Sequence, residues 1–382
     1  MNKYAKKMLE LSNDITKYEL SPTQLVEFQL GLVREALEYF ANANDLIKKE
    51  IENLGIDPKT AKTEDILLLA RSSDEFRGQP SGKYGIAGLA RILCRNTTEG
   101  GKVFRSSGTG GKGPVLIYRS PEALEIGVIN AMGYMRYITG IDLKGALVLS
   151  MIPKEATEFM AIGGFGIKGY EYFGAQIVYG MEVNPDIDPK EVPVIWHRLR
   201  PVERKIGQFL ASPAKTKILF TGNAGLHGML QNPNLKMYLG ENGYVVIGGG
   251  AKGNPAFKTS NLRKLMKGRI LVNGETAPLY DVLGLTESIN ILPTQANGEV
   301  LIPPPTMVYT ILDMDTDMPM ELVEGAEGEW VYFNPQTPDF PEVIRTGDQM
   351  KLVKVEGIPW TDFGLKHIQR ITTQGEQIFG CG

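Results

Sequence analysis

Near the start of the chain, apolar side chains recur at helical spacing. Ser21 and Pro22 form a typical helix start, because serine caps free N–H groups and proline suits the first turn. A second helical stretch ends at Gly55, since glycine accepts the left-handed turn that closes many helices. We therefore predict that residues 1–100 form a helical part packed on the main body. The apolar positions that follow Pro22 lie three or four residues apart, at Leu25, Phe28, Leu32, Ala36, Tyr39 and Phe40.

From residue 100 onward, short apolar and β-branched runs replace the helical period. Segments long enough for crossover helices, such as Pro121–Tyr137 and Asn261–Met266, separate several of these runs. Strands that alternate with helices are typical of an α/β sheet with parallel strands, so we predict an α/β core over residues 101–295. The runs are Val115–Tyr118, Ala146–Ile152, Ala175–Met181, Lys217–Gly222 and Tyr244–Gly250.

After about residue 295 the apolar runs lie closer together. Thr306–Asp315, Gly328–Pro335 and Glu342–Asp348 predict an antiparallel β region over residues 296–365 of the same body. Residues 366–382 then form a short C-terminal tail. With 382 residues and 42% hydrophobic content, the chain can bury a sizeable core.

Charge and cysteine content argue against several classes of protein. The net charge is −3 with acids and bases interspersed, so no basic face is expected for nucleic acid. The charged first twenty residues lack the apolar core of a signal peptide, and no run approaches the roughly 20 apolar residues of a membrane span. Only Cys94 and Cys381 are present, which favours a reducing, cytoplasmic location. The three histidines stand far apart, without zinc-ligand spacing.

The segment FRSSGTGGKGP, residues 104–114, is rich in glycine and hydroxyl groups. Backbone N–H groups in such a loop can converge on a phosphate, because glycine permits close approach. The loop does not match the P-loop pattern, since Ser106 occupies the first glycine position and Gly113 follows Lys112. Phosphate binding by a different kind of loop is the prediction.

A second glycine pattern, G-x-G-x-x-G, occurs at Gly164, Gly166 and Gly169. A dinucleotide site requires a strand directly before these glycines. The preceding residues have a helical pattern instead, so we interpret this match as unrelated to cofactor binding.

Three later segments place polar groups after predicted strands. Gly248, Gly249 and Gly250 form a glycine turn at the end of a strand, where sheet proteins commonly bind ligands. Thr286 and Glu287 follow the next strand, and a carboxylate beside phosphates is suited to Mg²⁺. Asp348 follows a glycine at the end of "VIRTGD" and can accept hydrogen bonds from ribose hydroxyls. Taken singly, a residue such as Glu287 or Asp348 is more often a solvated loop acid than a ligand-binding group.

Taken together and in this order, these segments resemble the adenylate-forming superfamily of acyl-activating enzymes. The resemblance implies that the glycine loop binds the triphosphate of ATP and that the glycine turn and Thr286 contact the nucleotide. It also implies that Glu287 holds Mg²⁺, that Asp348 grips the ribose, and that Arg370 corresponds to a hinge arginine. The loop residues that match are Ser106, Ser107, Gly108, Thr109, Gly110, Gly111 and Lys112.

The C-terminal part resembles the LuxE-type acyl-protein synthetases more narrowly, through "GGGAK", "IPPP" and the terminal "GCG". The resemblance implies that ATP activates a fatty acid, which is then transferred to Cys381 and passed to a partner acyl reductase. It also implies that the mobile C-terminal lid of the superfamily, with its catalytic lysine, is absent. Lys112 would then supply positive charge in the loop. Without the lid lysine, the protein would adenylate slowly, recruit another cation such as Lys168 or Lys252, or borrow a group of the partner.

Several alternatives remain open at the level of the sequence. A truncated phenylacetate–CoA ligase-like enzyme, or an adenylating enzyme of the phenazine-pathway type, would use an aromatic or small acid. A carrier of acyl groups or nucleotides would have kept the fold without the chemistry. Cys381 is either the acyl acceptor or an inert terminal cysteine, and Cys94 lies in an apolar helical context that indicates a core position. His197 and His227 are either structural or near the carboxylate pocket.

Overall fold

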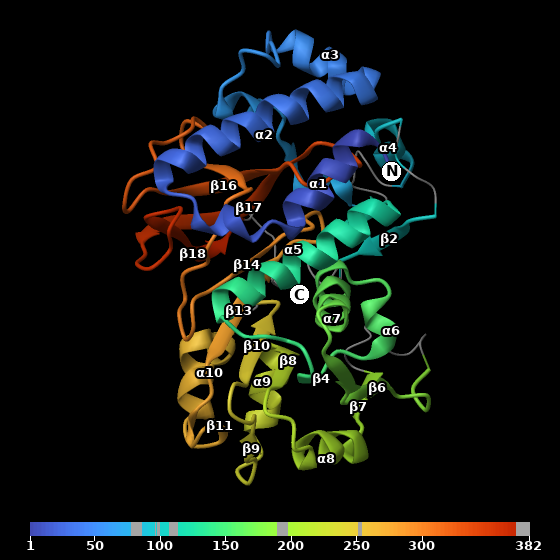
Figure 1. The fold of residues 1–382 in the computed structure, drawn as a ribbon, viewed down its shortest axis with the longest axis vertical. Helices are drawn as coiled ribbons and strands as arrows, with labels where there is room; N and C mark the ends of the chain where they lie inside the picture. Colours follow the sequence, from blue (N-terminus) through green and yellow to red (C-terminus); the bar gives the residue numbers. More distant parts are fainter. Residues whose placement is uncertain are drawn as a thin grey trace.

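The computed structural model describes residues 1–77, 86–95, 97, 100–106, 114–188, 198–250 and 254–371. Figure 1 shows the helical start above the C-terminal strands β16, β17 and β18, and the six-stranded sheet with α8, α9 and α10 at the opposite end. Helices α5 and α7 lie between these two ends. The N-terminal helices are α1 (Lys3–Asn13), α2 (Pro22–Ala43), α3 (Asp45–Asn53) and α4 (Ile86–Ile92), with 3₁₀ helices η1 (Ile15–Glu19), η2 (Thr63–Leu69) and η3 (Ser73–Phe76).

The start of α2 forms as the sequence predicts. The Ser21 side chain accepts a hydrogen bond from the Gln24 backbone N–H, and the Gln24 side chain accepts from the Ser21 backbone N–H. This capping box satisfies two N–H groups that a helix start otherwise leaves open. The apolar face of α2 is buried through Leu32, Ala36 and Phe40.

The central sheet has the order β14-β13-β10-β8-β4-β5, and only β14 runs antiparallel to its neighbour. The predicted crossover segments are helices, α5 (Pro121–Thr139) before β4 and α10 (Thr259–Met266) between β10 and β13. The strands are β4 (Leu147–Ser150), β5 (Gln176–Tyr179), β8 (Lys217–Gly222), β10 (Tyr244–Gly248), β13 (Leu279–Gly284) and β14 (Ile291–Pro293). The other helices around the sheet are α6 (Lys154–Thr157), α7 (Ala161–Tyr172), α8 (Glu203–Ala211), α9 (Asn223–Leu230) and η5 (Pro255–Phe257).

Both faces of this sheet are buried. Successive residues of β10 point to opposite faces, so Val245 belongs to the core that contains Leu226 of α9, while Val246 belongs to the core that contains Phe165 of α7. A parallel sheet covered on both faces has apolar residues at every strand position, which explains the continuous runs in the sequence.

The glycines of the G-x-G-x-x-G pattern lie inside α7, as the sequence interpretation requires. A Cβ atom at Gly169 would lie only 2.6 Å from Cβ of Met132 in α5. Glycine therefore lets α5 and α7 approach closely, and the pattern has no part in a dinucleotide site.

A second sheet carries the C-terminal part of the site. Strand β17 (Glu342–Lys354) pairs with β1 (Arg71–Ser72), β16 (Glu327–Asn334) and β18 (Phe363–Arg370), and β15 (Val308–Leu312) pairs with β16. Three small sheets complete the described strands. They contain β2 (Lys102–Arg105) with β3 (Leu116–Arg119), β6 (Met181–Val183) with β7 (Leu199–Pro201), and β9 (Met237–Tyr238) with β11 (Ile270–Val272) and β12 (Glu275–Thr276).

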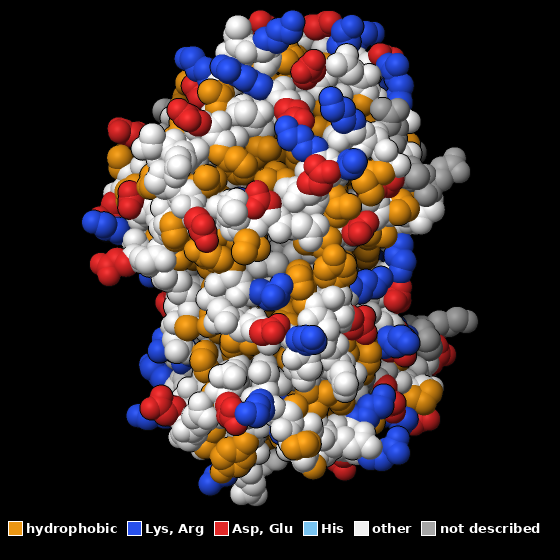
Figure 2. Space-filling view, in the orientation of Figure 1, with side chains coloured by type: hydrophobic (Ala, Val, Ile, Leu, Met, Phe, Trp, Pro, Cys, Tyr) orange, Lys and Arg blue, Asp and Glu red, His pale blue; other side chains and the backbone are white. Residues whose placement is uncertain are grey.

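The surface carries both signs of charge. On the face drawn in Figure 2, acidic and basic side chains are interspersed over all parts of the molecule. Within the described ranges, no helix combines the length and hydropathy required of a candidate membrane span.

Candidate nucleotide site

The base of the predicted phosphate loop is a closed hairpin. The Ser106 backbone N–H donates to the Val115 carbonyl at 3.0 Å, and the Val115 N–H donates to the Ser106 hydroxyl oxygen at 2.9 Å. Strands β2 and β3 therefore fix both ends of the loop, and the Ser106 side chain takes part in closing it. The other predicted loop residues, Ser107, Gly108, Thr109, Gly110, Gly111 and Lys112, lie outside the described residues.

The predicted glycine turn lies at the carboxyl end of β10. Gly249 and Gly250 have φ angles of +88° and +64°, a region that side chains rarely adopt. A Cβ at Gly248 would lie 3.2 Å from the Val282 carbonyl oxygen of neighbouring β13, so a side chain there would crowd that strand. The turn thus depends on glycine and leaves backbone exposed at a sheet edge where ligands commonly bind.

Glu287 lies in the turn that follows β13, but it is not solvated. Glu287 is only 3% exposed, and its Oε1 accepts a hydrogen bond from the Ser73 hydroxyl. Burial raises the pKa of the Glu287 carboxyl, an effect opposed by the Ser73 hydrogen bond and by the charges of Arg370 and Arg77. Thr286, beside it, is half-buried. The reading of Glu287 as a solvated loop acid is therefore wrong.

Asp348 is also buried, at 5% exposure, and its carboxylate faces two basic side chains of β18. Arg370 Nη1 donates to Oδ2 at 3.0 Å, and His367 Nε2 lies 3.3 Å from Oδ1. The antiparallel register places Asp348 opposite Arg370. Gly347 has a φ of +69°, but it lies within β17. The prediction that the strand ends at Asp348 is therefore wrong, because β17 continues to Lys354 in its pairing with β18. The solvated reading is wrong for this residue as well.

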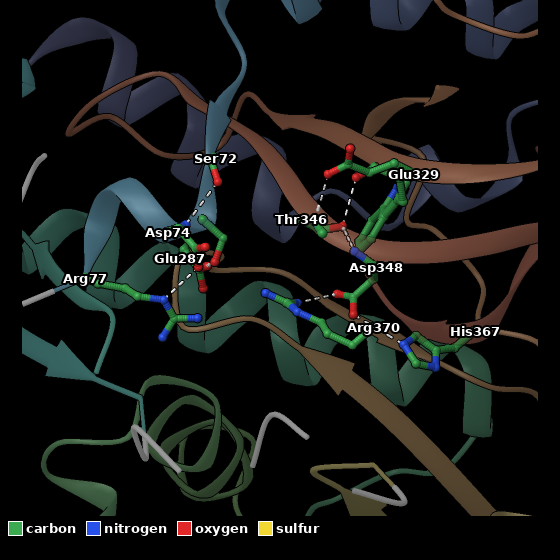
Figure 3. A network of polar contacts seen from close by, with 12 residues as sticks. Ser72, Asp74, Arg77, Glu287, Glu329, Thr346, Asp348, His367 and Arg370 are labelled. Atoms are coloured by element: carbon green, nitrogen blue, oxygen red, sulfur yellow. Dashed lines mark hydrogen bonds and ion pairs between the residues drawn. The ribbon is translucent and has the colours of Figure 1, made fainter. Parts of the chain in front are cut away.

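Figure 3 shows how Glu287, Asp348 and Arg370 approach one another from three parts of the chain. Arg77 lies on the other side of Glu287, directly after η3, and its Nε donates to Asp74 Oδ1 at 2.7 Å. Its main chain forms an isolated bridge with Val115, which places it at the base of the loop over residues 107–113. Arg77 carries no signal in the sequence, since nothing in "SSDEFR" indicates a neighbour more than thirty residues away.

The arrangement fits a magnesium nucleotide in its donor chemistry. Glu287 offers hard carboxylate oxygens, and its raised pKa means that its charge is poorly compensated, so a cation there would stabilise it. Among the described residues, no group of three or more His, Cys, Asp or Glu side chains is placed to hold a metal ion. A single carboxylate is sufficient for Mg²⁺, which usually keeps water ligands and binds substrate phosphates.

Among the remaining candidates, Cys94, His227 and Lys168 have their recorded contacts outside this group. Cys94 is 3% exposed, and burial raises the pKa of its thiol to about 12, so it is a core residue as expected. The rings of His227 and Phe257 meet edge-on, with their centroids 5.2 Å apart. Lys168 has Lys102 and Glu158 as charged neighbours. Cys381, His197 and Lys252 lie outside the described residues.

Comparison with known proteins identifies the fold. No protein-family model matches the chain, and no curated protein matches it in sequence. A structure of 2-hydroxyisobutyryl-CoA ligase in an open conformation, in complex with 2-HIB-AMP and CoA, matches with a TM-score of 0.65 and 14% identity, over 94% of this chain and 79% of that chain.

A structure of 2-hydroxyisobutyryl-CoA ligase in the postadenylation state, in complex with 2-HIB-AMP, gives a TM-score of 0.63 and 15% identity. That match covers 95% of this chain and 72% of the other. The chain therefore has the mixed α/β fold of adenylate-forming enzyme domains.

Proposed function

We propose that this protein activates a carboxylic acid with ATP, forming an acyl-adenylate and releasing pyrophosphate. The observation that carries the proposal is the approach of two buried carboxylates, Glu287 and Asp348, with Arg370 lying toward both. The base of the glycine loop adjoins the same place through Arg77. The similar ligase structures contain an acyl-AMP compound, 2-HIB-AMP, which supports the same reaction class.

The chemistry requires groups of this kind. A carboxylate is a poor electrophile, and its oxygen must attack the α-phosphorus of ATP while the bond to pyrophosphate breaks. The protein must hold both reactants in line and neutralise charge that builds on the phosphates. In the proposal, Lys112 and the amides from Ser107 to Gly111 bind the triphosphate, while Asp348 and Arg370 bind the ribose.

Glu287 is the proposed ligand of Mg²⁺, which when bound would neutralise phosphate charge and orient the leaving group. Thr286 and the turn at Gly248–Gly250 contact the nucleotide in this proposal. Arg77, at the base of the loop, adds a cation beside Glu287. None of these groups needs to move a proton in the adenylation step, because the acid reacts as its carboxylate.

The finer proposal is a ligase of the LuxE type. A fatty acyl group would move from the adenylate to the thiolate of Cys381, with AMP as the leaving group, and pass to an acyl reductase. The N-terminal helical part, the α/β core, the β-rich part and the short tail would then act as parts of one adenylating body. The alternative substrates are aromatic or small acids, as in the phenylacetate–CoA ligase-like and phenazine-type enzymes.

Pyrophosphate exchange tests the proposal and separates these alternatives. The protein is incubated with ATP, labelled pyrophosphate, Mg²⁺ and one acid at a time, from long-chain fatty acids to aryl and small acids. Acid-dependent exchange supports adenylation, and the acid that supports it identifies the class. Nucleotide binding without exchange for any acid would instead favour a non-catalytic carrier.

A further inference from the structure

Arg119 is a buried arginine whose hydrogen bonds and ion pair join it to elements of the nucleotide site, while its guanidinium also lies 5.2 Å from the centroid of the Phe340 ring. It is the last residue of β3 and has no exposed surface. Its Nη1 donates to the Thr337 hydroxyl at 2.8 Å, and its Nη2 donates to the main-chain carbonyl of Glu287. The same Nη2 lies 3.1 Å from Oε2 of Glu342, a residue also without exposed surface.

These contacts connect three parts of the site. Strand β3 begins just after the predicted phosphate loop and ends at Arg119. Glu342 begins β17, the strand that carries Asp348 farther along, and its Oε1 accepts from Asn334 Nδ2 at 3.0 Å. The third contact holds the turn of Glu287 itself. A planar guanidinium can serve these acceptors together because its donors have a fixed fork geometry.

Glu287 is thereby restrained at two points. The Ser73 hydroxyl holds its carboxylate, and Arg119 holds its main-chain carbonyl. Fixing the carbonyl fixes the peptide plane, and with it the direction in which the Glu287 side chain leaves the backbone. A buried ion pair is by itself weak evidence for stability, since apolar residues of similar volume often serve as well.

We propose that Arg119 is a positioning residue for the metal-bound nucleotide. It orients the Glu287 carboxylate and fixes its position relative to β3 and β17. The proposal deepens the proposed function and rests on it, since it assumes that Glu287 meets the cation of a magnesium nucleotide. Arg119 touches neither nucleotide nor acid and acts through Glu287.

The test measures ATP affinity by calorimetry, once with Mg²⁺ and once in EDTA, and takes the ratio of the two Kd values as the metal effect. Arg119→Lys keeps the positive charge but loses the planar set of guanidinium donors. We expect it to reduce the metal effect about tenfold, as loss of a residue that orients a metal ligand commonly does. Affinity in EDTA should change less than about twofold, since Arg119 does not contact the nucleotide in this proposal.

Two further variants keep the test valid if Arg119→Lys folds poorly. Arg119→Gln with Glu342→Gln removes both charges of the Arg119–Glu342 pair together and should show the same reduction. Thr337→Val removes the acceptor for Nη1, together with a hydrogen bond to the Glu342 carboxylate, and should give a smaller reduction. Arg269→Lys is the matched control, because Arg269 donates to the carbonyls of Leu230 and Asn232, which are not site residues.

Each outcome decides between two claims. A wild-type metal effect in the folded Arg119 variants overturns the positioning role, and so does an equal reduction in Arg269→Lys. Glu287→Gln, measured alongside, tests the site itself. If Glu287→Gln keeps the full metal effect, the metal role of Glu287 in the proposed function fails. If Glu287→Gln loses the metal effect and Arg119→Lys does not, only the positioning role fails.

Discussion

Glu287→Gln should weaken the nucleotide site and yet stabilise the protein when no ligand is present. Burial raises the pKa of the Glu287 carboxyl, so the folded protein favours the neutral form. Glutamine is neutral and nearly the same size, and its carbonyl oxygen can still accept the hydrogen bond that Ser73 donates to Oε1. The substitution therefore removes the cost of a buried charge while keeping the local contact.

The sign of the pH dependence follows from the raised pKa. Below the ordinary glutamate pKa of 4.5, the Glu287 carboxyl is neutral in folded and unfolded protein alike, and the variant gains nothing. As the pH rises above 4.5, the unfolded state releases this proton first and the wild-type protein loses stability relative to the variant. The difference stops growing above the raised pKa of the folded state.

The size of the effect can be bounded. A single stabilising substitution commonly raises the free energy of unfolding by about 0.5–2 kcal/mol. An unfolding entropy of about 2.1 cal/mol/K per residue corresponds to about 0.8 kcal/mol/K over 382 residues. The expected rise in Tm at pH 8 is therefore about 0.6–2.5 °C.

Thermal unfolding, followed by circular dichroism at one scan rate between pH 4 and pH 8 without nucleotide or Mg²⁺, measures this difference. Glu329→Gln is the control, because Glu329 is also buried but accepts from Arg345 Nε at 2.6 Å and from the Gly347 N–H at 3.1 Å. That substitution breaks an ion pair and should not raise the Tm. A Tm of Glu287→Gln below that of the wild type at pH 8 refutes the reasoning.

Three further outcomes are expected. Asp348→Asn should raise the Kd for ATP about 10- to 150-fold, since a charge-assisted hydrogen bond is worth roughly 1.5–3 kcal/mol, and an unchanged Kd rules out a ribose contact. Lys112→Ala and Thr109→Val should each slow pyrophosphate exchange more than about tenfold at an unchanged Tm, because each removes a proposed phosphate contact. If both variants exchange pyrophosphate at the wild-type rate, the loop is not part of the site. With labelled fatty acid and ATP, Cys381→Ser should abolish hydroxylamine-sensitive label on the protein while exchange persists; a thioester that remains, or that forms on Cys94, contradicts the acceptor role.

Much of the fold could be predicted because local patterns and tertiary structure agree. The cap at Ser21, the crossover helix that begins at Pro121 and the apolar run of β10 each have one physical explanation, and the structure contains all three elements. The helical setting of Gly169 was also readable, since the residues before it have the wrong period for a strand.

The site could be predicted only in part. Glycine turns and residues that follow strands carry a local signal, which is how Gly249, Glu287 and Asp348 were found. Burial carries none: nothing near Glu287 in the sequence indicates that Ser73 would donate to it or that Arg119 would hold its carbonyl. These partners come from positions more than one hundred residues away. Such contacts exist only after folding.

The two buried carboxylates, Glu287 and Asp348, differ in the donors that contact them, and this difference supports their separate roles. Asp348 faces Arg370 at 3.0 Å and His367 at 3.3 Å, so donors already surround it. A further neutral donor, such as a ribose hydroxyl, suits that setting better than a metal ion beside a guanidinium. Glu287 has a serine hydroxyl as its hydrogen-bond donor, and its pKa remains raised despite the arginine charges nearby. A carboxylate of this kind gains most from a cation, which is why we assign Mg²⁺ to Glu287 and ribose to Asp348.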